Sequence, residues 1–267
     1  MDLSGGQFLL SEPGGIAELE LSPNPTGWPE DEPIISLTPS LTLANPFDRT
    51  HLFILERMTW SDQSLLAAEV IMLQQFRDLF SREALRPGEQ ISVGTLAIVF
   101  TDLRDSTRLY QQIGDAPAFG RVMEHFDVLK QAIAEQDGSI VKTIGDAVMA
   151  VFRTPTEALR AMLSAQIALD NAFKGALSLK AGIHYGHAIA VTLNERLDYF
   201  GSTINLAARL EKYSDGEDLI LSNSVYEDPE IQDFFFDNKT ILKTEPVAVQ
   251  LKGFDEEIQL WRVRKVT

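Results

Sequence analysis

The chain of 267 residues contains no cysteine and only four histidines. Without cysteine it cannot form disulfide bonds, use a thiolate nucleophile or build a zinc site on sulfur ligands. His184 and His187 lie three residues apart, but the neighbouring sequence offers no carboxylate that would complete a metal site with them. We therefore interpret this pair as two residues of a strand rather than as metal ligands.

Basic residues are also scarce, because 23 Lys and Arg stand against 39 Asp and Glu and leave a formal net charge of −16. This charge disfavours nucleic acids and anionic membranes as partners, so a phosphate ligand would be held by a local arrangement. The longest apolar runs, such as residues 96–100, are far too short to cross a membrane, and the first residues lack the basic region of a signal peptide. We expect a cytoplasmic, globular protein that binds no nucleic acid and does not insert into membranes.

Residues 1–60 have a strand-like composition. Seven acidic residues and no Lys or Arg fall within residues 1–32, and short alternating apolar runs are separated by turn residues. This pattern predicts a small antiparallel, β-rich N-terminal region. Its position ahead of the rest of the chain makes it the expected place for a regulatory ligand or partner.

A linking helix followed by a turn is expected over residues 61–92. Behind a serine that can serve as its N-cap, apolar residues recur at helical spacing until the breaker at residues 86–90. The apolar stripe fits a helix that faces the core. The alternative is a coupling or dimer helix between two domains, because Leu66, Leu73 and Phe80 keep a seven-residue step, but two repeats are too few to establish it.

Residues 93–267 predict one α+β domain. A buried strand ends at residue 103 and is followed by helices, a β-hairpin over residues 138–152 and a further helix. A strand pair or one long bent strand over residues 177–193 completes the order βαββαβ. This order is typical of a ferredoxin-like unit, an antiparallel sheet with helices packed on one face. A later helix over residues 200–214 and closing strands complete the domain.

Charged side chains stand where strands of this unit end. Asp102 ends the first strand, and Asp146 lies at the turn of the hairpin that neighbours this strand in a ferredoxin-like sheet. Two converging carboxylates repel each other unless a divalent cation neutralises them, and oxygen ligands suit Mg²⁺ or Mn²⁺. The helix start near Ser106 and Thr107 offers free backbone N–H groups to a phosphate. The simpler alternative is that the Gly-Asp pair only makes the turn and that Lys142 extends from a strand edge.

A second group of polar side chains lies further along the chain. Asn205 and Arg209 are four residues apart on the predicted helix, hence on one face, and Asp198 precedes the turn that opens this helix. A polar stripe that faces solvent would be the ordinary explanation. Apolar residues crowd the same helical turns, however, so the two polar groups stand out.

Three motifs in this order, FTDLRDST, VKTIGDAVMAVF and DYFGSTINLAARL, resemble the catalytic domain of class III nucleotidyl cyclases, the adenylate and guanylate cyclase family. The resemblance covers about residues 93–265, close to two thirds of the chain, and the short segment between Gly186 and Asp198 is similar to that of bacterial members. It implies a palm-type, ferredoxin-like fold and an adenylate cyclase that converts ATP into cyclic AMP. It also implies a head-to-tail homodimer in which each subunit completes the other's site.

The resemblance further implies a role for each matching residue. Asp102 and Asp146 would bind two Mg²⁺ or Mn²⁺ ions, with help from the carbonyl of Leu103, for in-line attack of the ribose 3′-hydroxyl. Lys142 and Asp198 would recognise adenine, the lysine as donor and the carboxylate as acceptor. Asn205 would orient the ribose, and Arg209 would meet the charge on the α-phosphate. Ser106 and Thr107 would contact the triphosphate, and Lys252 would contact its terminal phosphates.

One residue departs from the family pattern, because Asp105 stands in the phosphate loop where the family usually has glycine. Either Arg104 and Arg108 offset its charge or the affinity for nucleotide is poor. Two alternatives stay open. One is a cyclase for GTP or a pyrimidine triphosphate, because only Lys142 and Asp198 argue for adenine, and the other is a catalytically silent module that binds nucleotide, which Asp105 would favour. A diguanylate cyclase is excluded, because its Gly-Gly-Asp/Glu-Glu-Phe hairpin is replaced here by TIGDAV.

Overall fold

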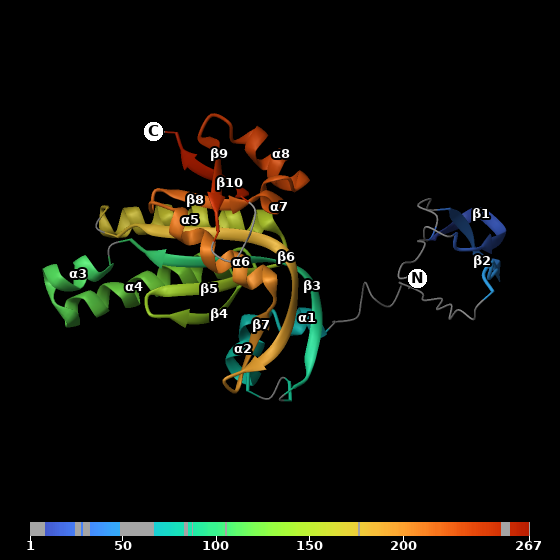
Figure 1. The fold of residues 1–267 in the computed structure, drawn as a ribbon, viewed down its shortest axis with the longest axis horizontal. Coiled ribbons are helices and arrows are strands. Elements are labelled where there is room, and N and C mark those ends of the chain that lie inside the picture. The colour runs from blue at the N-terminus through green and yellow to red at the C-terminus, as the bar shows by residue number, and fades with distance from the viewer. Residues whose placement is uncertain are drawn as a thin grey trace. The chain divides into compact units, whose positions relative to one another are not determined.

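The computed structural model describes residues 9–24, 28, 33–48, 67–82, 85–86, 88–104, 106–175, 177–251 and 257–266. The chain divides into two compact units, an N-terminal unit of residues Met1–Gln63 and a C-terminal unit of residues Ser64–Thr267 (Figure 1). All of the candidate site residues fall within the C-terminal unit.

The N-terminal unit contains two paired strands, β1 (Leu10–Leu21) and β2 (Ile34–Leu43). They pair in parallel, from Leu10 opposite Ile34 to Leu21 opposite Leu43, so the prediction of an antiparallel arrangement is wrong. The physical reason is the length of the connection: the 12 residues between the strands allow the chain to cross back, whereas a tight antiparallel hairpin needs a turn of a few residues. The strand expected near residues 51–60 lies outside the described residues.

The segment expected to form one linking helix is broken. The structure describes two short helices, α1 (Ala67–Val70) and α2 (Gln74–Phe80), and between them Leu73 has an extended backbone with φ −69° and ψ 125°. Ile71 and Met72 in the break are buried in a core cluster against the sheet. Tertiary packing of these two side chains therefore overrides the helical propensity of the segment. Residues 61–66 lie outside the described part of the chain.

The C-terminal unit is built on a sheet of eight strands in the order β4-β5-β3-β6-β8-β10-β9, with β7 paired to β6. The first four strands in this order form the predicted ferredoxin-like arrangement, in which β3 lies between the hairpin and β6. β6 and β8 pair in parallel, and the other pairs are antiparallel. The strands are β3 (Gln90–Leu103), β4 (Ser139–Ile144), β5 (Ala147–Phe152), β6 (Leu179–Leu193), β7 (Arg196–Phe200), β8 (Asp218–Ser222), β9 (Leu242–Gln250) and β10 (Glu257–Lys265).

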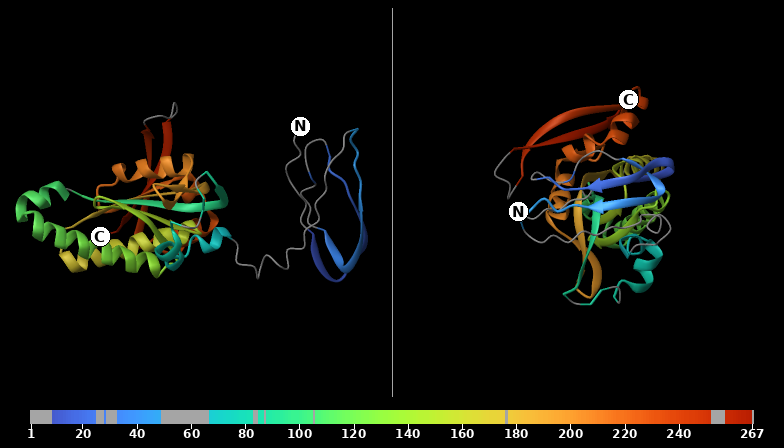
Figure 2. Two further views of the ribbon diagram at one scale, coloured as in Figure 1. Left: turned by 90° about the horizontal axis from the view of Figure 1, so that it is seen from below. Right: turned by 90° about the vertical axis from the view of Figure 1, so that its right-hand side faces the viewer.

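Helices pack on both faces of this sheet, as Figure 2 shows from below for α4 and α5 on one side and α6 on the other. Leu129 of α4 and Leu159 of α5 are fully buried in the larger core cluster, whereas Ala207 of α6 belongs to the cluster on the opposite face. The prediction of helices on one face therefore holds for the ferredoxin-like helices alone. The helices are α3 (Ser106–Ile113), α4 (Asp115–Ala134), α5 (Pro155–Phe173), α6 (Ser202–Leu210), a 3-10 turn at Glu211–Tyr213, α7 (Asn223–Tyr226) and α8 (Pro229–Asp237).

Local sequence explains several of these boundaries. α5 begins with a capping box, in which the Thr154 hydroxyl accepts from the Glu157 amide and the Glu157 carboxylate accepts from the Thr154 amide, and Pro155 follows the cap. The long β6 runs as one strand of 15 residues that includes His184 and His187, so their interpretation as strand residues is confirmed. None of the described helices is long and apolar enough to span a membrane.

Candidate active site

The β4–β5 turn places Asp146 at one end of the sheet. Gly145 has φ +65° and Asp146 does not have positive φ, which is the pattern of a type II′ hairpin turn with glycine first. Oδ2 of Asp146 is buried and has no hydrogen-bond partner among the described residues. A carboxylate oxygen that is buried without a donor is costly, and a bound cation would remove that cost.

Asp102 lies close to Asp146 because β3 pairs directly with β5, with Thr101 opposite Val148. Burial raises the pKa of Asp102, and the negative charge of Asp146 raises it further. Lys180 stands opposite Asp102 on β6 and acts in the other direction, since its positive charge favours the ionised carboxylate. The structure thus brings together the two carboxylates that the sequence analysis paired, and it adds a cation to them.

These residues fit an oxygen-ligated divalent cation. The described residues contain no cluster of three or more His, Cys, Asp or Glu side chains able to enclose a metal, so two carboxylates would leave most coordination positions to backbone, water or phosphate oxygens. The side chain of Leu103 is buried in the core, so only its backbone can serve such a site. A third carboxylate, Glu211, lies nearby: burial raises its pKa, and the charge of Asp102 raises it too.

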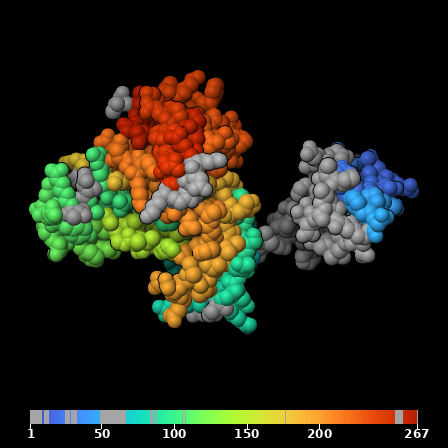
Figure 3. All heavy atoms as spheres, in the orientation of Figure 1, coloured from blue at the N-terminus to red at the C-terminus, as the bar shows by residue number. Residues whose placement is uncertain are grey.

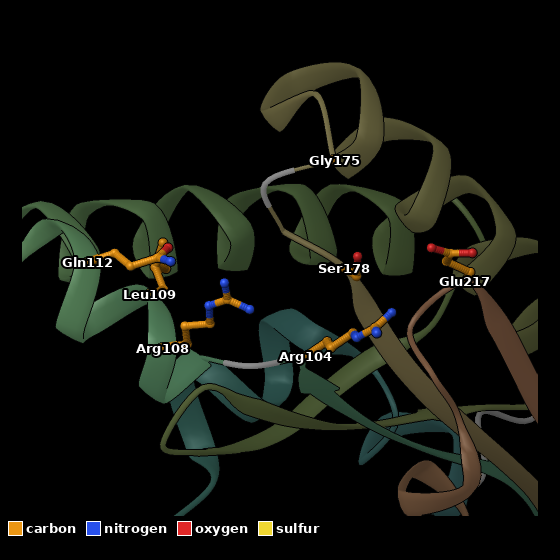
Figure 4. A pocket seen from close by; sticks show the side chains of 7 residues that line it. All are labelled: Arg104, Arg108, Leu109, Gln112, Gly175, Ser178 and Glu217. Carbon is orange, nitrogen blue, oxygen red and sulfur yellow. The ribbon is translucent and has the colours of Figure 1, made fainter.

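A pocket of about 330 Å³ opens beside the end of β3. The side chains of Arg104 and Arg108 reach into it between α3 and the segment before β6, where Ser178 lies, and Glu217 stands at the far side (Figure 4). The Arg104 amide donates to the Ser178 carbonyl at 2.9 Å, which extends the β3–β6 ladder past Leu103. Arg104 is the first residue beyond β3, two residues after Asp102.

The phosphate loop is only partly described. Ser106 and Thr107 lie in the first turn of α3, as predicted from the sequence. Asp105 and Lys252 both lie outside the described residues, so their assignments stay predictions.

Lys142 and Asp198 form an ion pair, with Lys142 Nζ donating to Asp198 Oδ2. The Asp198 side chain is 10% exposed and that of Lys142 is 39% exposed. The other oxygen of Asp198 accepts from the Tyr199 amide at 2.8 Å. A register shift between Ile140 and Lys142 marks a β-bulge on β4, and such a bulge re-aims the side chain that follows it. The structure therefore joins residues 56 positions apart into one donor and acceptor pair.

Asn205 and Arg209 lie on α6 as predicted. Nη1 of Arg209 donates to the Asn205 carbonyl at 2.5 Å, so the guanidinium folds back along the helix toward Asn205. Figure 3 shows the lime surface of β4 and β5 bordering the orange surface of β7 and α6, so these elements expose their sides on one face of the unit.

Two residues of this region were not found from the sequence. Lys180 could have been noticed as the one charged residue in an apolar strand, but its place opposite Asp102 depends on the β3–β6 register. Glu211 follows the predicted helix without any motif, and only the fold brings it near Asp102.

Residues 89–261 match the family model described as the adenylate and guanylate cyclase catalytic domain. An adenylate cyclase of Lachancea kluyveri is 33% identical over 173 residues, which cover 55% of this chain and 9% of that protein. Adenylate cyclase 1 of Rhizobium meliloti is 31% identical over 131 residues, which cover 42% of this chain and 20% of that protein. The chain thus spans only a small part of the length of these relatives.

Solved structures share the fold. The adenylyl cyclase CyaB from P. aeruginosa superposes with a TM-score of 0.57 at 18% identity, covering 67% of this chain and 97% of that one. The guanylate cyclase domain of RhGC from Catenaria anguillulae, solved in complex with GTP, gives a TM-score of 0.56 at 18% identity and covers 66% of this chain and 100% of that one. Likeness at this identity establishes the architecture and leaves the choice of nucleotide to the site residues.

Proposed function

Because the chain belongs to the adenylate and guanylate cyclase catalytic domain family, we propose that it is an adenylate cyclase that converts ATP into 3′,5′-cyclic AMP and pyrophosphate. The observation that carries the choice of ATP is the Lys142–Asp198 pair. Adenine presents a ring-nitrogen acceptor beside an amino donor, which matches an ammonium donor beside a carboxylate acceptor. Guanine presents the reverse order on the same edge, and this pair would repel it.

Asp102 and Asp146 would hold the divalent cations, two Mg²⁺ or Mn²⁺ ions in the proposed site. The unpartnered Oδ2 of Asp146 and the raised pKa of Asp102, caused by burial and then by Asp146, support this role. When bound, the metal supplies a lowered pKa for the ribose 3′-hydroxyl and charge neutralisation for the triphosphate. The two carboxylates fix where this chemistry takes place.

Arg209 and Asn205 would act on the reacting part of the nucleotide. The amide of Asn205 is exposed and can orient the ribose by hydrogen bonds, while the guanidinium of Arg209 can meet the charge that grows on the α-phosphate during in-line attack. An interaction that strengthens only in the transition state raises kcat rather than substrate affinity. The roles of these two residues therefore differ in their kinetic signatures.

Cations beside the metal carboxylates would receive the phosphates. Lys180 stands opposite Asp102, and Arg104 and Arg108 share the pocket at the end of the same strand. The start of α3, with Ser106 and Thr107, adds backbone donors, and Lys252 remains a proposed contact to the terminal phosphates. The two arginines would offset the charge of Asp105 in this loop.

A homodimer would complete the site. In this arrangement Lys142, Asp198, Asn205 and Arg209 of one subunit act on the nucleotide whose metals are held by Asp102 and Asp146 of the partner. Two exposed apolar side chains flank the site residues and support an interface there: Ile144, 54% exposed, lies two residues before Asp146, and Phe200, 56% exposed, lies two residues after Asp198.

The direct test is to incubate the purified protein with ATP, GTP, CTP or UTP and either Mg²⁺ or Mn²⁺, and to identify products by mass, with Asp146→Ala as the blank. We expect cyclic AMP from the wild type alone. A different cyclic nucleotide would retain the mechanism and reject the adenine assignment. No product from a folded, dimeric protein under any condition would favour a silent nucleotide-binding module.

A further inference from the structure

Arg77 of α2 is a buried cation that the proposed chemistry does not use. It is only 4% exposed, and it forms no ion pair with a carboxylate among the described residues. Burial lowers the pKa of Arg77, although arginine stays charged in proteins. A buried charge is expensive unless its surroundings compensate it, and the negative charge of Asp198 favours the charged form of Arg77.

The contacts of Arg77 converge on the strand that carries Asp198. Its guanidinium donates to the Ile71 carbonyl at 2.9 Å and to the Leu197 carbonyl at 2.7 Å, and its Cζ lies 5.1 Å from the centre of the Tyr199 ring. Leu197 and Tyr199 are the two chain neighbours of Asp198 on β7. Arg77 therefore contacts this short strand on both sides of Asp198, the carboxylate proposed to recognise adenine.

Further contacts attach residues 71–81 to β7. The Leu197 amide donates to the Ser81 carbonyl at 2.7 Å, immediately after α2. Ile71 and Met72 share a core cluster with Leu197 and Tyr199, which packs the α1–α2 break against β7. β7 is only five residues long and, among the described strands, pairs with β6, so the contacts from residues 71–81 add to a single strand pairing.

Residues 71–81 also form hydrogen bonds with β4, the strand that carries Lys142. The Ser139 hydroxyl donates to the Met72 carbonyl, and the Ile140 amide donates to Oε1 of Gln74 at 2.7 Å. The Ile140 contact is made at the bulge that precedes Lys142. One short segment ahead of the family domain thus contacts both strands whose side chains form the Lys142–Asp198 pair.

We propose that Arg77 is a positioning residue for base recognition: by anchoring residues 71–81 to β7 beside Asp198, it sets the Lys142–Asp198 pair in the geometry that selects adenine. This inference rests on the proposed function and extends it to a residue outside the matched range of 89–261. It also makes residues 71–81 the segment through which a change ahead of the family domain would reach the base-recognition pair.

The test compares ATP with purine riboside triphosphate, which lacks the exocyclic amine that Asp198 would bind. For each variant the kcat/KM ratio of the two substrates is measured. In Arg77→Met we expect kcat/KM for ATP to fall by about 10–100-fold, the usual range for removing a supporting contact, and the ratio to approach one. Arg77→Lys keeps the charge and one donor, so it should retain an intermediate ratio. The metal concentration for half-maximal activity should stay at the wild-type value.

Arg153→Met is the matched control. Arg153 also joins the sheet to this region, through an ion pair of 2.8 Å with Glu69 on α1, and this ion pair involves no residue of β7 or β4. Its substrate ratio should equal that of the wild type. If Arg77→Met slows both substrates equally in a wild-type background that does discriminate, Arg77 supports folding alone and the proposal is overturned. If Arg77→Met does not fold, the ratio of Arg77→Lys decides.

A second measurement separates this proposal from the proposed function. Urea unfolding of Arg77→Met, Asp198→Asn and the double variant requires no nucleotide. Coupling between the two sites should make the two losses of stability non-additive. If the wild type does not discriminate between the two substrates, the adenine assignment fails. The unfolding measurements on the three variants then test the coupling between Arg77 and Asp198 by themselves, and additive losses of stability would reject it.

Discussion

Lys142 on β4 and Asp146 in the two-residue turn that follows this strand face different partners. Lys142 pairs with Asp198, whereas Oδ2 of Asp146 has no partner among the described residues and lies near Asp102. In the proposed dimer the two charges act on different nucleotides. In this proposal one hairpin carries both a base-recognition residue and a metal ligand.

The base-recognition pair gives the first prediction. Lys142→Glu with Asp198→Cys replaces the donor and removes the acceptor that match adenine, so preference should shift toward GTP. We expect kcat/KM for ATP to fall by roughly 100-fold or more, because a site that hydrogen-bonds one base leaves buried groups unpaired with another. Steady-state kinetics with both nucleotides measures the shift. An unchanged ratio of ATP to GTP would show that other residues choose the base.

His184 gives a prediction for stability against pH. Burial lowers the pKa of His184 to about 4, and Nδ1 lies 2.8 Å from the Ser222 hydroxyl. In the unfolded chain the histidine ionises near its ordinary pKa of about 6.5, so between these values the unfolded state binds more protons. The stabilisation is complete above this window, and as pH falls the free energy of unfolding should decrease by about 1.4 kcal/mol per unit from this group. Buried His125, with its pKa also lowered to about 4, adds to the slope.

Urea unfolding at several pH values measures this slope. His184→Gln should reduce the slope of the free energy of unfolding against pH by the contribution of one titrating group, because glutamine does not titrate. If the variant has the same slope as the wild type, another group takes up the proton and the prediction for His184 is wrong.

At the scale of elements, the position of α6 depends on the absence of a side chain at Gly182. A Cβ added there would lie 2.5 Å from the Leu210 Cβ and 2.7 Å from the Glu211 amide nitrogen, so the end of α6 lies directly against β6. Arg209 immediately precedes Leu210. The close approach of helix and strand thus fixes the backbone from which the Arg209 side chain extends.

Gly182→Ala should therefore reduce both stability and activity. We expect a loss of about 1–3 kcal/mol in the free energy of unfolding from overpacking, together with a lower kcat as the end of α6 moves. The control is Gly120→Ala in α4, where a Cβ meets nothing within 4 Å and alanine should stabilise the helix by up to about 1 kcal/mol. A Gly182→Ala enzyme with normal kcat would show that Arg209 tolerates displacement.

The elements that follow from local chemistry were predictable, and those that depend on distant contacts were not. The capping residues of α5 and the Gly-Asp turn of the hairpin carry their own signals in the sequence. The break between α1 and α2 arises because Ile71 and Met72 pack against strands more than 100 residues later, such as β7. The same holds in the site: Asp102 and Asp146 were found from strand ends, whereas Lys180, Glu211 and Arg77 depend on register and packing.

At the scale of the whole molecule, the C-terminal unit has a core of its own. The three large core clusters of the C-terminal unit contain no described residue before Ile71 apart from the flanking Ala68. Residues 64–267 expressed alone should therefore fold, with a thermal midpoint within a few degrees of that of the full chain. Circular dichroism and calorimetry measure this.

The N-terminal unit is proposed to be regulatory, by setting the geometry of the dimer. Deletion of residues 1–60 should then leave the fold intact but change how specific activity depends on protein concentration. Activity that matches the full chain at every concentration would count heavily against this role.

Mixing two inactive variants tests the central proposal most directly. Asp146→Ala lacks a metal ligand and Arg209→Ala lacks the group at the α-phosphate, and each should be nearly inactive alone. After mixing in equal amounts and reassociation, half of the dimers carry one variant of each kind and have one intact site of two, so cyclic AMP formation should recover to about a quarter of the wild-type rate. No recovery from dimers shown to be mixed, beside an active wild type, would contradict a site shared between subunits.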